Sequence, residues 1–350
     1  MKKLRLTAKY TGFLFLSAVL FSCAASPQTQ TPPLWVADTE KAYPDRDWLC
    51  VVEAEQDAKL AERAAVTRLA QVFRVDLVSI TDANRQFAET ISSVKGKKRL
   101  ITSQSSDIAQ ELISTSAVSG LIGLQVESWA NPKGRSYANA RMNRKECSAR
   151  YSAMIRENEN VIGGLLEEAE RNPRTFDAFQ MLNLAYSFAE VTDNFYSLLT
   201  VLDPSAISRR PSYGNAEAVR SLAQSAGRSI VVTVRVNGDN SGRIEKAFTE
   251  CLNSRGFRTS AAGGNSYMLA ASLELEDVDI ANPNYKFARY ILNYSLKDRG
   301  DVELLSSSDN GREGHLTGPE ARQRAIRAAE QAITSTGFAV NFDAFLASLL

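Results

Sequence analysis

Hydrophobic and polar positions divide the chain into a short apolar leader, a polar segment and two longer regions of regular periodicity. Residues 10–22 are apolar or small throughout and follow a positive head. The basic residues of that head are Lys2, Lys3, Arg5 and Lys9. Because a membrane-spanning helix needs about 20 apolar residues, the leader is too short to cross a bilayer. A basic head before a short apolar stretch is typical of a secretory signal peptide, which we predict for residues 1–22.

The first periodic region, residues 34–165, combines strand and helix patterns. Trp48–Val52 is a short apolar run that predicts a buried strand. Asp57–Phe73 carries one apolar stripe at steps of three and four residues, which predicts a helix. Further strands are expected at Val75–Ile80, Ala117–Trp129 and Ser136–Met142. A basic turn at Lys95–Arg99 is expected to be solvated, and a helix from about Lys145 closes the region.

Residues 166–215 predict a helical connector. Arg171–Arg174 breaks one helix, a second begins near Thr175, and a third segment runs from Asp193 to Leu202. The proline- and glycine-containing stretch from Asp203 to Ala216 then marks a domain boundary.

Residues 216–350 form a second α+β region. Ser229–Val236 predicts a strand and Arg243–Ser254 a helix. Alternating apolar residues from Tyr267 and from Tyr290 predict two long strands, and Val302–Ser306 a further hairpin arm. Thr317–Glu320 has the pattern of a capping box that opens the last long helix. We therefore expect two α+β domains, each an antiparallel sheet with helices on one face, joined by the helical connector.

The end of the leader, Leu20–Ala24, resembles a lipobox. That resemblance implies that a diacylglycerol is attached to Cys23 and that the signal is cut just before it. Ala24 stands where an aspartate favours inner-membrane retention in some bacteria, so the resemblance points to the outer membrane. Residues 23–33 are rich in Pro, Ser, Thr and Gln and predict a flexible tether after the lipidated cysteine.

The charge balance limits the class of partner. The chain has 41 basic and 40 acidic residues, and removing the four basic residues of the leader leaves 37 against 40, a net charge of −3. A general nucleic-acid binder shows a basic surplus, so we expect no nucleic-acid partner.

The remaining cysteines, Cys50, Cys147 and Cys251, do not form a C-x-x-C pair, and no cysteine lies near His315, the single histidine. This spacing offers no zinc site. Cys50 and Cys147 are either partners in a disulfide, as an oxidising compartment allows, or two small buried residues. Both alternatives remain open from the sequence.

Several segments together resemble the LPP-twenty type of outer-membrane lipoprotein and its flagellar relatives FlgP and the N-terminal part of FlgT. The matching segments are Leu34–Val36, Tyr43–Pro44, the Trp48–Val52 strand with its alanine-rich helix, the strand ending at Trp129, Ser136–Ala140 and the helix after Arg144. The resemblance covers residues 34–165. It implies a location at the outer membrane and a role in cell-surface or flagellar assembly, and it supplies no catalytic residue. Residues 216–350 loosely resemble the periplasmic domains of TolB, CsgG and the middle of FlgT.

One loop imitates a calcium site. Asn237, Asp239 and Ser241 alternate before Gly242, but Phe248 stands where a bidentate glutamate is required. We interpret the loop as a strand-to-helix connection capped by Asn240 or Ser241. The sequence contains no nucleophile elbow and no H-E-x-x-H helix.

We therefore expect no enzyme, no cofactor and no metal. The expected function is a structural or assembly component of the cell envelope, facing the periplasm from the inner leaflet of the outer membrane, with the cell surface as the other possible face. Its expected partners are the membrane, through the lipid on Cys23, and envelope proteins or further copies of itself. The alternative is a binding module for an envelope glycan or lipid, which requires a concave pocket or an aromatic groove.

Lipid attachment is tested by labelling cells with radioactive palmitate. We expect the wild-type protein to carry the label and Cys23→Ser to lose it, because no other residue of the leader offers a thiol. A Cys23→Ser protein that still carries palmitate and stays on the membrane after a salt wash would show that the lipobox interpretation is wrong.

Overall fold

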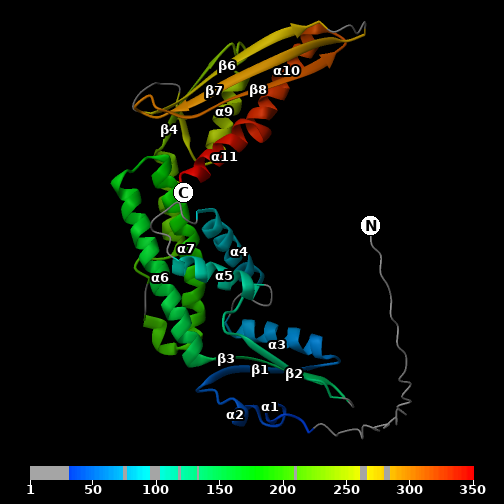
Figure 1. Ribbon diagram of the computed structural model, residues 1–350, viewed down its shortest axis with the longest axis vertical. Coiled ribbons are helices and arrows are strands. Elements are labelled where there is room, and N and C mark those ends of the chain that lie inside the picture. Colours follow the sequence, from blue (N-terminus) through cyan, green and yellow to red (C-terminus); the bar gives the residue numbers. More distant parts are fainter. Residues whose placement is uncertain are drawn as a thin grey trace, which may run out of the picture.

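Two β-sheets lie at opposite ends of the longest axis of the molecule, with long helices between them (Figure 1). The computed structural model describes residues 31–73, 77–94, 103–116, 120–131, 134–208, 211–260, 266–279 and 284–350. The predicted signal peptide, Cys23 and the basic turn Lys95–Arg99 lie outside the described residues. The separate helices and sheets confirm the predicted α+β class.

The N-terminal sheet is antiparallel and has the strand order β1-β3-β2. Its strands are β1 (Trp48–Glu55), β2 (Gln125–Trp129) and β3 (Ser136–Asn143). Helix α3 (Ala58–Val72) covers one face, where its small residues Ala61 and Ala65 are fully buried. The short helices α1 (Leu34–Ala37) and α2 (Thr39–Ala42) lie on the other side of the sheet (Figure 1). These elements confirm the predicted strands at Trp48 and Ser136 and the helix after Asp57.

The strand predicted for Val75–Ile80 is wrong where the structure describes it. Leu77 begins helix α4 (Leu77–Val94), in which Ile80, Phe87, Ala88 and Ile91 are buried. Their spacing of seven, eight and eleven residues places them on one helical face, a period that a six-residue window cannot show. Helix α5 (Ser103–Ser116) follows and packs against α4.

The long strand predicted for Ala117–Trp129 is shorter than expected, since among its described residues, 120–129, only Gln125–Trp129 is a strand. Gly120 and Gly123 have φ values of +69° and +85°, in the left-handed region that glycine adopts without strain. They turn the chain before the strand begins. A Cβ at position 123 would lie 2.6 Å from Cys147 Sγ, so this turn packs closely on the next helix.

Three helices connect the two sheets: α6 (Arg144–Arg171), α7 (Phe176–Leu202) and α8 (Ala216–Ser229). The predicted break at Arg171–Arg174 is confirmed. The further break expected before Asp193 is wrong, because α7 continues through this residue. Its buried residues, from Phe176 to Leu202, occur on most sides of the helix, so neighbouring helices enclose it and tertiary packing sustains its length.

The C-terminal sheet has the order β5-β4-β6-β7-β8. Its strands are β4 (Val231–Asn237), β5 (Arg258–Ser260), β6 (Tyr267–Val278), β7 (Lys286–Lys297) and β8 (Glu303–His315). The last three are antiparallel as predicted, but β4 runs parallel to β5 and β6, so the sheet is mixed. Helix α9 (Arg243–Ser254) provides the crossover that parallel strands require.

One face of the C-terminal sheet is covered by helices (Figure 1). These are α9, α10 (Gly318–Gln331) and α11 (Phe338–Ser348), with a short π-helical turn, Ala332–Thr336, between the last two. The sheet face beneath them buries Leu269, Leu292 and Leu296, each 0 % exposed. The opposite face, which we call the outer face, has no helix over it among the described residues.

The buried residues form two cores, and helix α7 contributes to both. The first core joins the N-terminal sheet, α4, α5 and the connector helices, and it includes Val219 and Ala223 of α8. The second core fills the C-terminal sheet and its helices, and it includes Phe176 at the start of α7. The division into residues 34–165, 166–215 and 216–350 stays a prediction, and the packing of α8 joins it physically to the connector.

Phe176 is the buried residue of α7 that belongs to the second core. It is 2 % exposed, and its ring centroid lies 4.5 Å from that of Tyr267 and 5.1 Å from that of Phe257. We expect Phe176→Ala to lower the free energy of unfolding by about 3 to 5 kcal/mol, since a large buried ring leaves a cavity. Urea denaturation followed by circular dichroism measures the change. Leu222→Ala, at a residue 51 % exposed, is the control, and an equal loss in both variants would contradict this role.

Candidate functional site

The outer face of the C-terminal sheet is lined with short polar side chains. A shallow hollow of about 550 Å³ lies over it. Its outward-facing residues are Asn237, Ala270, Ser272, Asn293, Ser295, Ser306 and Ser308. Ser272 pairs with Asn293, which pairs in turn with Ser308, so hydroxyl and amide groups form rows across the strands. This face offers hydrogen bonding over a flat surface and lacks the depth of an enclosed pocket.

Strand β8 is the edge of this sheet, and one of its sides pairs with β7. It is 13 residues long, whereas β5 at the other edge has three residues. The segment Leu304–Ser308 is uncharged, and the strand contains no proline. Natural sheets usually shield an edge with charges, proline or a covering segment. In the described part of the chain, no strand pairs with the free side of β8. Arg324 of α10 donates to the Gly314 carbonyl oxygen at 3.4 Å, near the end of the strand.

The sequence predicted only Val302–Ser306 as a strand in this part of the chain, but β8 continues to His315. Ser, Asn and Gly are poor strand formers, so their composition gave no strand signal. Aromatic rings of β7 compensate for the glycines. A Cβ on Gly311 would lie 2.5 Å from Tyr290 Cε1, and one on Gly314 would lie 2.7 Å from Phe287 Cε1. The rings therefore rest directly on the glycine backbone and hold the second half of β8 in the sheet.

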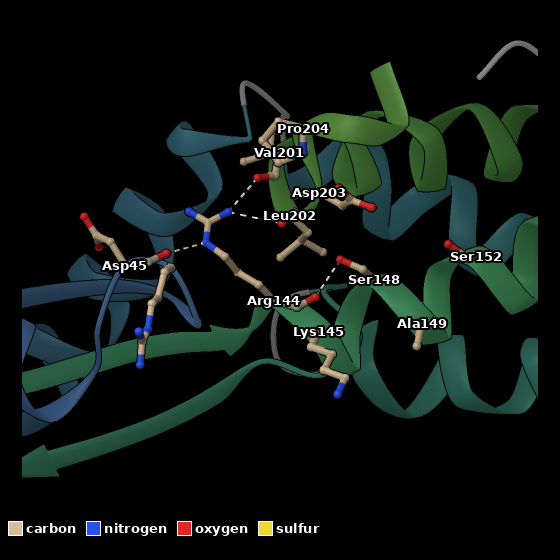
Figure 2. Close-up of a pocket in the computed structure, with 11 residues that line it drawn as sticks. Asp45, Arg144, Lys145, Ser148, Ala149, Ser152, Val201, Leu202, Asp203 and Pro204 are labelled. Carbon is tan, nitrogen blue, oxygen red and sulfur yellow. Dashed lines mark hydrogen bonds between the residues drawn. The ribbon is translucent and has the colours of Figure 1, made fainter. Parts of the chain in front are cut away.

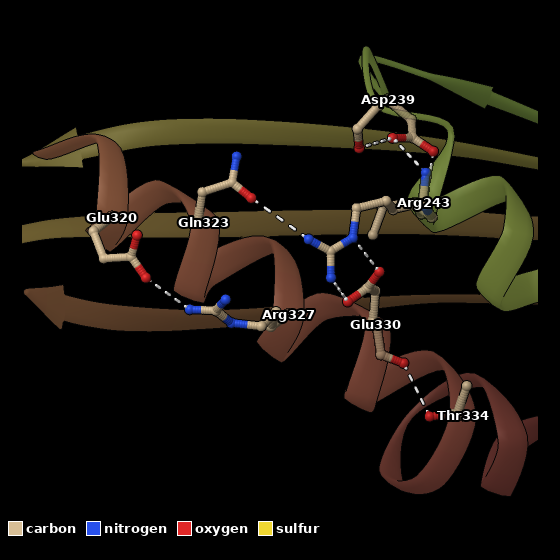
Figure 3. Close-up of polar contacts among 9 residues, drawn as sticks. Asp239, Arg243, Glu320, Gln323, Arg327, Glu330 and Thr334 are labelled. Carbon is tan, nitrogen blue, oxygen red and sulfur yellow. Dashed lines mark hydrogen bonds and ion pairs between the residues drawn. The ribbon is translucent and has the colours of Figure 1, made fainter.

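The loop that imitates a calcium site is a helix cap. Asp239 accepts backbone N–H groups of Arg243 (3.2 Å), Ile244 (2.7 Å) and Glu245 (3.0 Å) at the start of α9 (Figure 3). Asp239 therefore makes the cap expected of Asn240 or Ser241. Gly238 lets the loop pass the sheet, because a Cβ there would lie 2.2 Å from the Leu273 carbonyl oxygen. Within the described ranges, no group of three or more His, Cys, Asp or Glu residues is placed to hold a metal ion.

The same region fastens α9 to α10. Arg243 Nε donates to Glu330 Oε1 (2.6 Å) and its Nη2 donates to Glu330 Oε2 (2.5 Å), a bidentate pair between the two helices (Figure 3). The capping box predicted for Thr317–Glu320 is wrong, because its two side chains do not bond the backbone N–H groups at the start of α10. Thr317 makes no side-chain capping bond, and Glu320 pairs with Arg327 at 3.0 Å. These charged residues therefore have a structural role, because they hold α9 and α10 together over the sheet.

A larger cavity, of about 730 Å³, opens where the N-terminal sheet meets the connector helices. Arg144 lies at its centre (Figure 2). Its Nε donates to the Asp45 carbonyl oxygen, and its Nη1 donates to the carbonyl oxygens of Val201 and Leu202, at 2.8, 2.8 and 3.3 Å. The guanidinium thus satisfies the last carbonyls of α7 and joins them to the segment before β1. This geometry is a structural joint.

Cys50 and Cys147 are both free in the structure, and each contacts a different residue. Cys50 donates to Asn139 Oδ1 at 2.9 Å, and Cys147 is buried beside the Gly123 carbonyl. Burial raises the pKa of each thiol to about 11, so neither is a ready nucleophile. The two alternatives from the sequence, a disulfide between Cys50 and Cys147 or two small buried residues, both stay predictions. His315 accepts a weak bond from the Thr317 N–H at 3.4 Å and has no nucleophile or acid partner among the described residues.

No protein-family model matches the chain, and no curated protein matches it by sequence. Three solved structures are similar to the chain at low identity. A minor lipoprotein of Acinetobacter baumannii is 10 % identical, with a TM-score of 0.26 over 34 % of this chain and 90 % of that one. Rare lipoprotein B of Shewanella oneidensis is 14 % identical, with a TM-score of 0.24 over 32 % and 98 %. A secreted protein of Helicobacter pylori is 14 % identical, with a TM-score of 0.37 over 87 % and 98 %.

Two of these similar structures are thus lipoproteins and the third is a secreted protein. Across the residues that the structure describes, no helix has both the length and the apolar character to span a membrane.

The Asp239 cap gives a pH-dependent prediction. Burial alone would raise the pKa of this carboxyl, but hydrogen bonds from the N–H groups at the start of α9 and from Ser241 hold it below its usual value. The stability it contributes is therefore present above the unfolded pKa, near 4, and is lost as the pH falls through the folded pKa.

We expect Asp239→Ala to lower the free energy of unfolding by about 1 kcal/mol at pH 7, the usual cost of a lost cap, and by less at pH 3. Urea denaturation at both pH values measures this, with the exposed Asp107→Ala as the control. A loss at pH 3 equal to the loss at pH 7 would contradict the assigned cap.

Proposed function

We propose that this protein is a non-enzymatic, lipid-anchored component of the outer membrane that assembles in the periplasm by pairing strand β8 with β8 of a second copy. The observation that carries this proposal is the 13-residue edge strand, whose second side pairs with no strand in the described part of the chain. Such an edge presents unpaired backbone N–H and carbonyl groups, which bind another strand by extending the sheet.

The residues of β8 complement one another about a two-fold axis at Ser308. In an antiparallel pair of identical strands centred there, Ser306 of one copy faces Asn310 of the other. The pairing of β7 with β8 skips Leu304: Leu296 pairs with Leu305, and the next residue, Lys297, pairs with Glu303. Counting with that shift, Glu303 of each copy faces Arg312 of the other, and both side chains are on the outer face. Opposite charges directly across a strand pair stabilise it.

The anchoring end supports the same proposal. The lipobox-like Leu20–Cys23 would attach the chain to the membrane eleven residues before Leu34, where α1 begins. An extended tether of that length reaches at most about 36 to 40 Å. The N-terminal sheet would therefore stay close to the bilayer, while the C-terminal sheet lies at the opposite end of the molecule (Figure 1). Copies held on one membrane meet at a raised local concentration, so a modest strand contact suffices.

The resemblance of residues 34–165 to LPP-twenty type lipoproteins agrees with this role, because that family is described by its location and by surface and flagellar assembly. We infer that the chain faces the periplasm from the inner leaflet of the outer membrane. We also infer that it takes no cofactor and no nucleic acid, and that its partner at β8 is a second copy of itself.

Assembly is tested by light scattering on the full-length protein in detergent micelles. We expect a dimer for the wild type and a monomer for Ser308→Lys, because the new lysines would face each other across the two-fold axis. Ser272→Lys, on the same face of the central strand β6, should remain dimeric.

Charge exchange gives an independent check. Glu303→Lys and Arg312→Glu should each weaken the dimer, and the double variant should restore it. A wild-type protein that stays monomeric at every concentration measured, or a Ser308→Lys variant that dimerises as the wild type does, would contradict the proposal.

A further inference from the structure

A groove of about 400 Å³ runs between helices α7 and α8, on a part of the molecule remote in sequence from β8. Helix α7 contributes Phe179, Asn183 and Tyr186, and helix α8 contributes Arg220, Gln224 and Arg228. The residues of α7 are spaced by four and three, and those of α8 by four and four, so each set occupies one face of its helix. The turn that contains Arg255 and Gly256 closes one end.

The closed end of the groove is held firmly. Arg255 Nε and Nη2 donate to the two carboxylate oxygens of Asp343, at 2.6 and 2.7 Å, which neutralises this cation. Phe179 packs edge-on against Phe257 with a centroid distance of 4.9 Å. A Cβ on Gly227 would lie 3.0 Å from Phe179 and 3.2 Å from the Gly256 carbonyl oxygen, so α8 approaches this end as closely as its backbone allows.

The open length of the groove carries polar groups without partners. Arg228, Gln224 and Asn183 have no side-chain hydrogen bond or ion pair to any described residue. Arg220 has a loose contact with Glu217, at 3.6 Å and on the same helix. No acidic residue is among the described residues that line the groove, but Tyr186 donates its hydroxyl to Glu190 at 3.2 Å beside it. The two arginines are eight residues apart, which separates them by about 12 Å along α8 and places Gln224 midway.

We propose that this groove binds an acidic glycan. Guanidinium groups bind carboxylates through paired N–H bonds, and two of them on residues two turns apart along one helix suit anionic groups that repeat along an extended chain. The amides of Asn183 and Gln224 both donate and accept, as sugar hydroxyls do. The ring of Tyr186 adds an amphipathic surface beside them. An acidic peptide would match the arginines alone, since the groove offers no strand edge and no deep apolar pocket for side chains.

The test uses the full-length protein in detergent micelles and isothermal titration calorimetry. The probe is oligogalacturonate, which carries one carboxylate on each sugar. Neutral dextran fragments and poly-glutamate are the comparison ligands. We expect oligogalacturonate to bind, to bind more weakly as salt rises, and to bind more tightly than either comparison ligand.

Variants then locate the site. Arg228→Gln should weaken binding of oligogalacturonate on the order of tenfold, and Arg220→Gln with Arg228→Gln should abolish it. Arg228→Lys should keep part of the affinity. Asn183→Ala should weaken binding of the glycan and leave binding of poly-glutamate unchanged. The exposed Arg63→Gln on α3 is the matched control and should bind as the wild type does.

All of these are surface substitutions, and an unchanged melting temperature will confirm that each variant is folded. The proposal is overturned if oligogalacturonate does not bind, if poly-glutamate binds as tightly, or if the double arginine variant binds as the wild type does. The last two outcomes would assign the binding to an acidic peptide or to charge elsewhere on the surface. Ser308→Lys should bind the glycan normally, so failure of strand pairing and failure of this site are distinguishable.

Discussion

The packing of α7 against its neighbours is the constraint on which the rest of the structure depends. Each of the long helices α6 and α7 spans about 40 Å, and they run side by side between the two sheets (Figure 1). A buried polar contact fixes how they meet: Asn158 Nδ2 on α6 donates to Thr192 Oγ1 on α7 at 2.9 Å, and both residues are 0 % exposed. Sliding one helix by a turn would leave these groups unpaired in an apolar core, which costs about 1 to 3 kcal/mol for each group.

Because α7 also supplies Phe176 to the second core, the two sheets have a defined separation. Other contacts hold the two ends of the connector. Arg144 joins the end of α7 to the segment before β1, and Asp193 accepts both the Tyr213 hydroxyl (2.7 Å) and the Ala216 N–H (2.8 Å), which fastens the loop before α8. Strand β8 therefore lies at a set distance from the N-terminal sheet. The groove between α7 and α8 exists only because the same loop returns α8 along α7.

The sequence predicted elements well where the periodicity is strong and local. The helix after Asp57 and the alternating strands β6 and β7 are examples, since burial of one face decides them. It failed where distant contacts decide. Strand β8 depends on Tyr290 and Phe287 covering its glycines, and the parallel pairing of β4 depends on the α9 crossover. The four-residue spacing of Arg220, Gln224 and Arg228 can be read from the sequence. The groove cannot, because it also requires α7 to lie opposite these residues. The predicted lipid site at Cys23 rests on a local motif and does not depend on the fold.

Crosslinking in living cells tests the central claim, that an anchored chain assembles through β8. A cysteine placed at Ser308 would face its own copy across the two-fold axis, whereas the native Cys50, Cys147 and Cys251 are buried or half-buried. The account predicts that Ser308→Cys forms a disulfide-linked dimer in the periplasm and that the same change at Ser272 does not. A Ser308→Cys protein that stays uncrosslinked under oxidising conditions, or that links to other proteins only, would contradict the account.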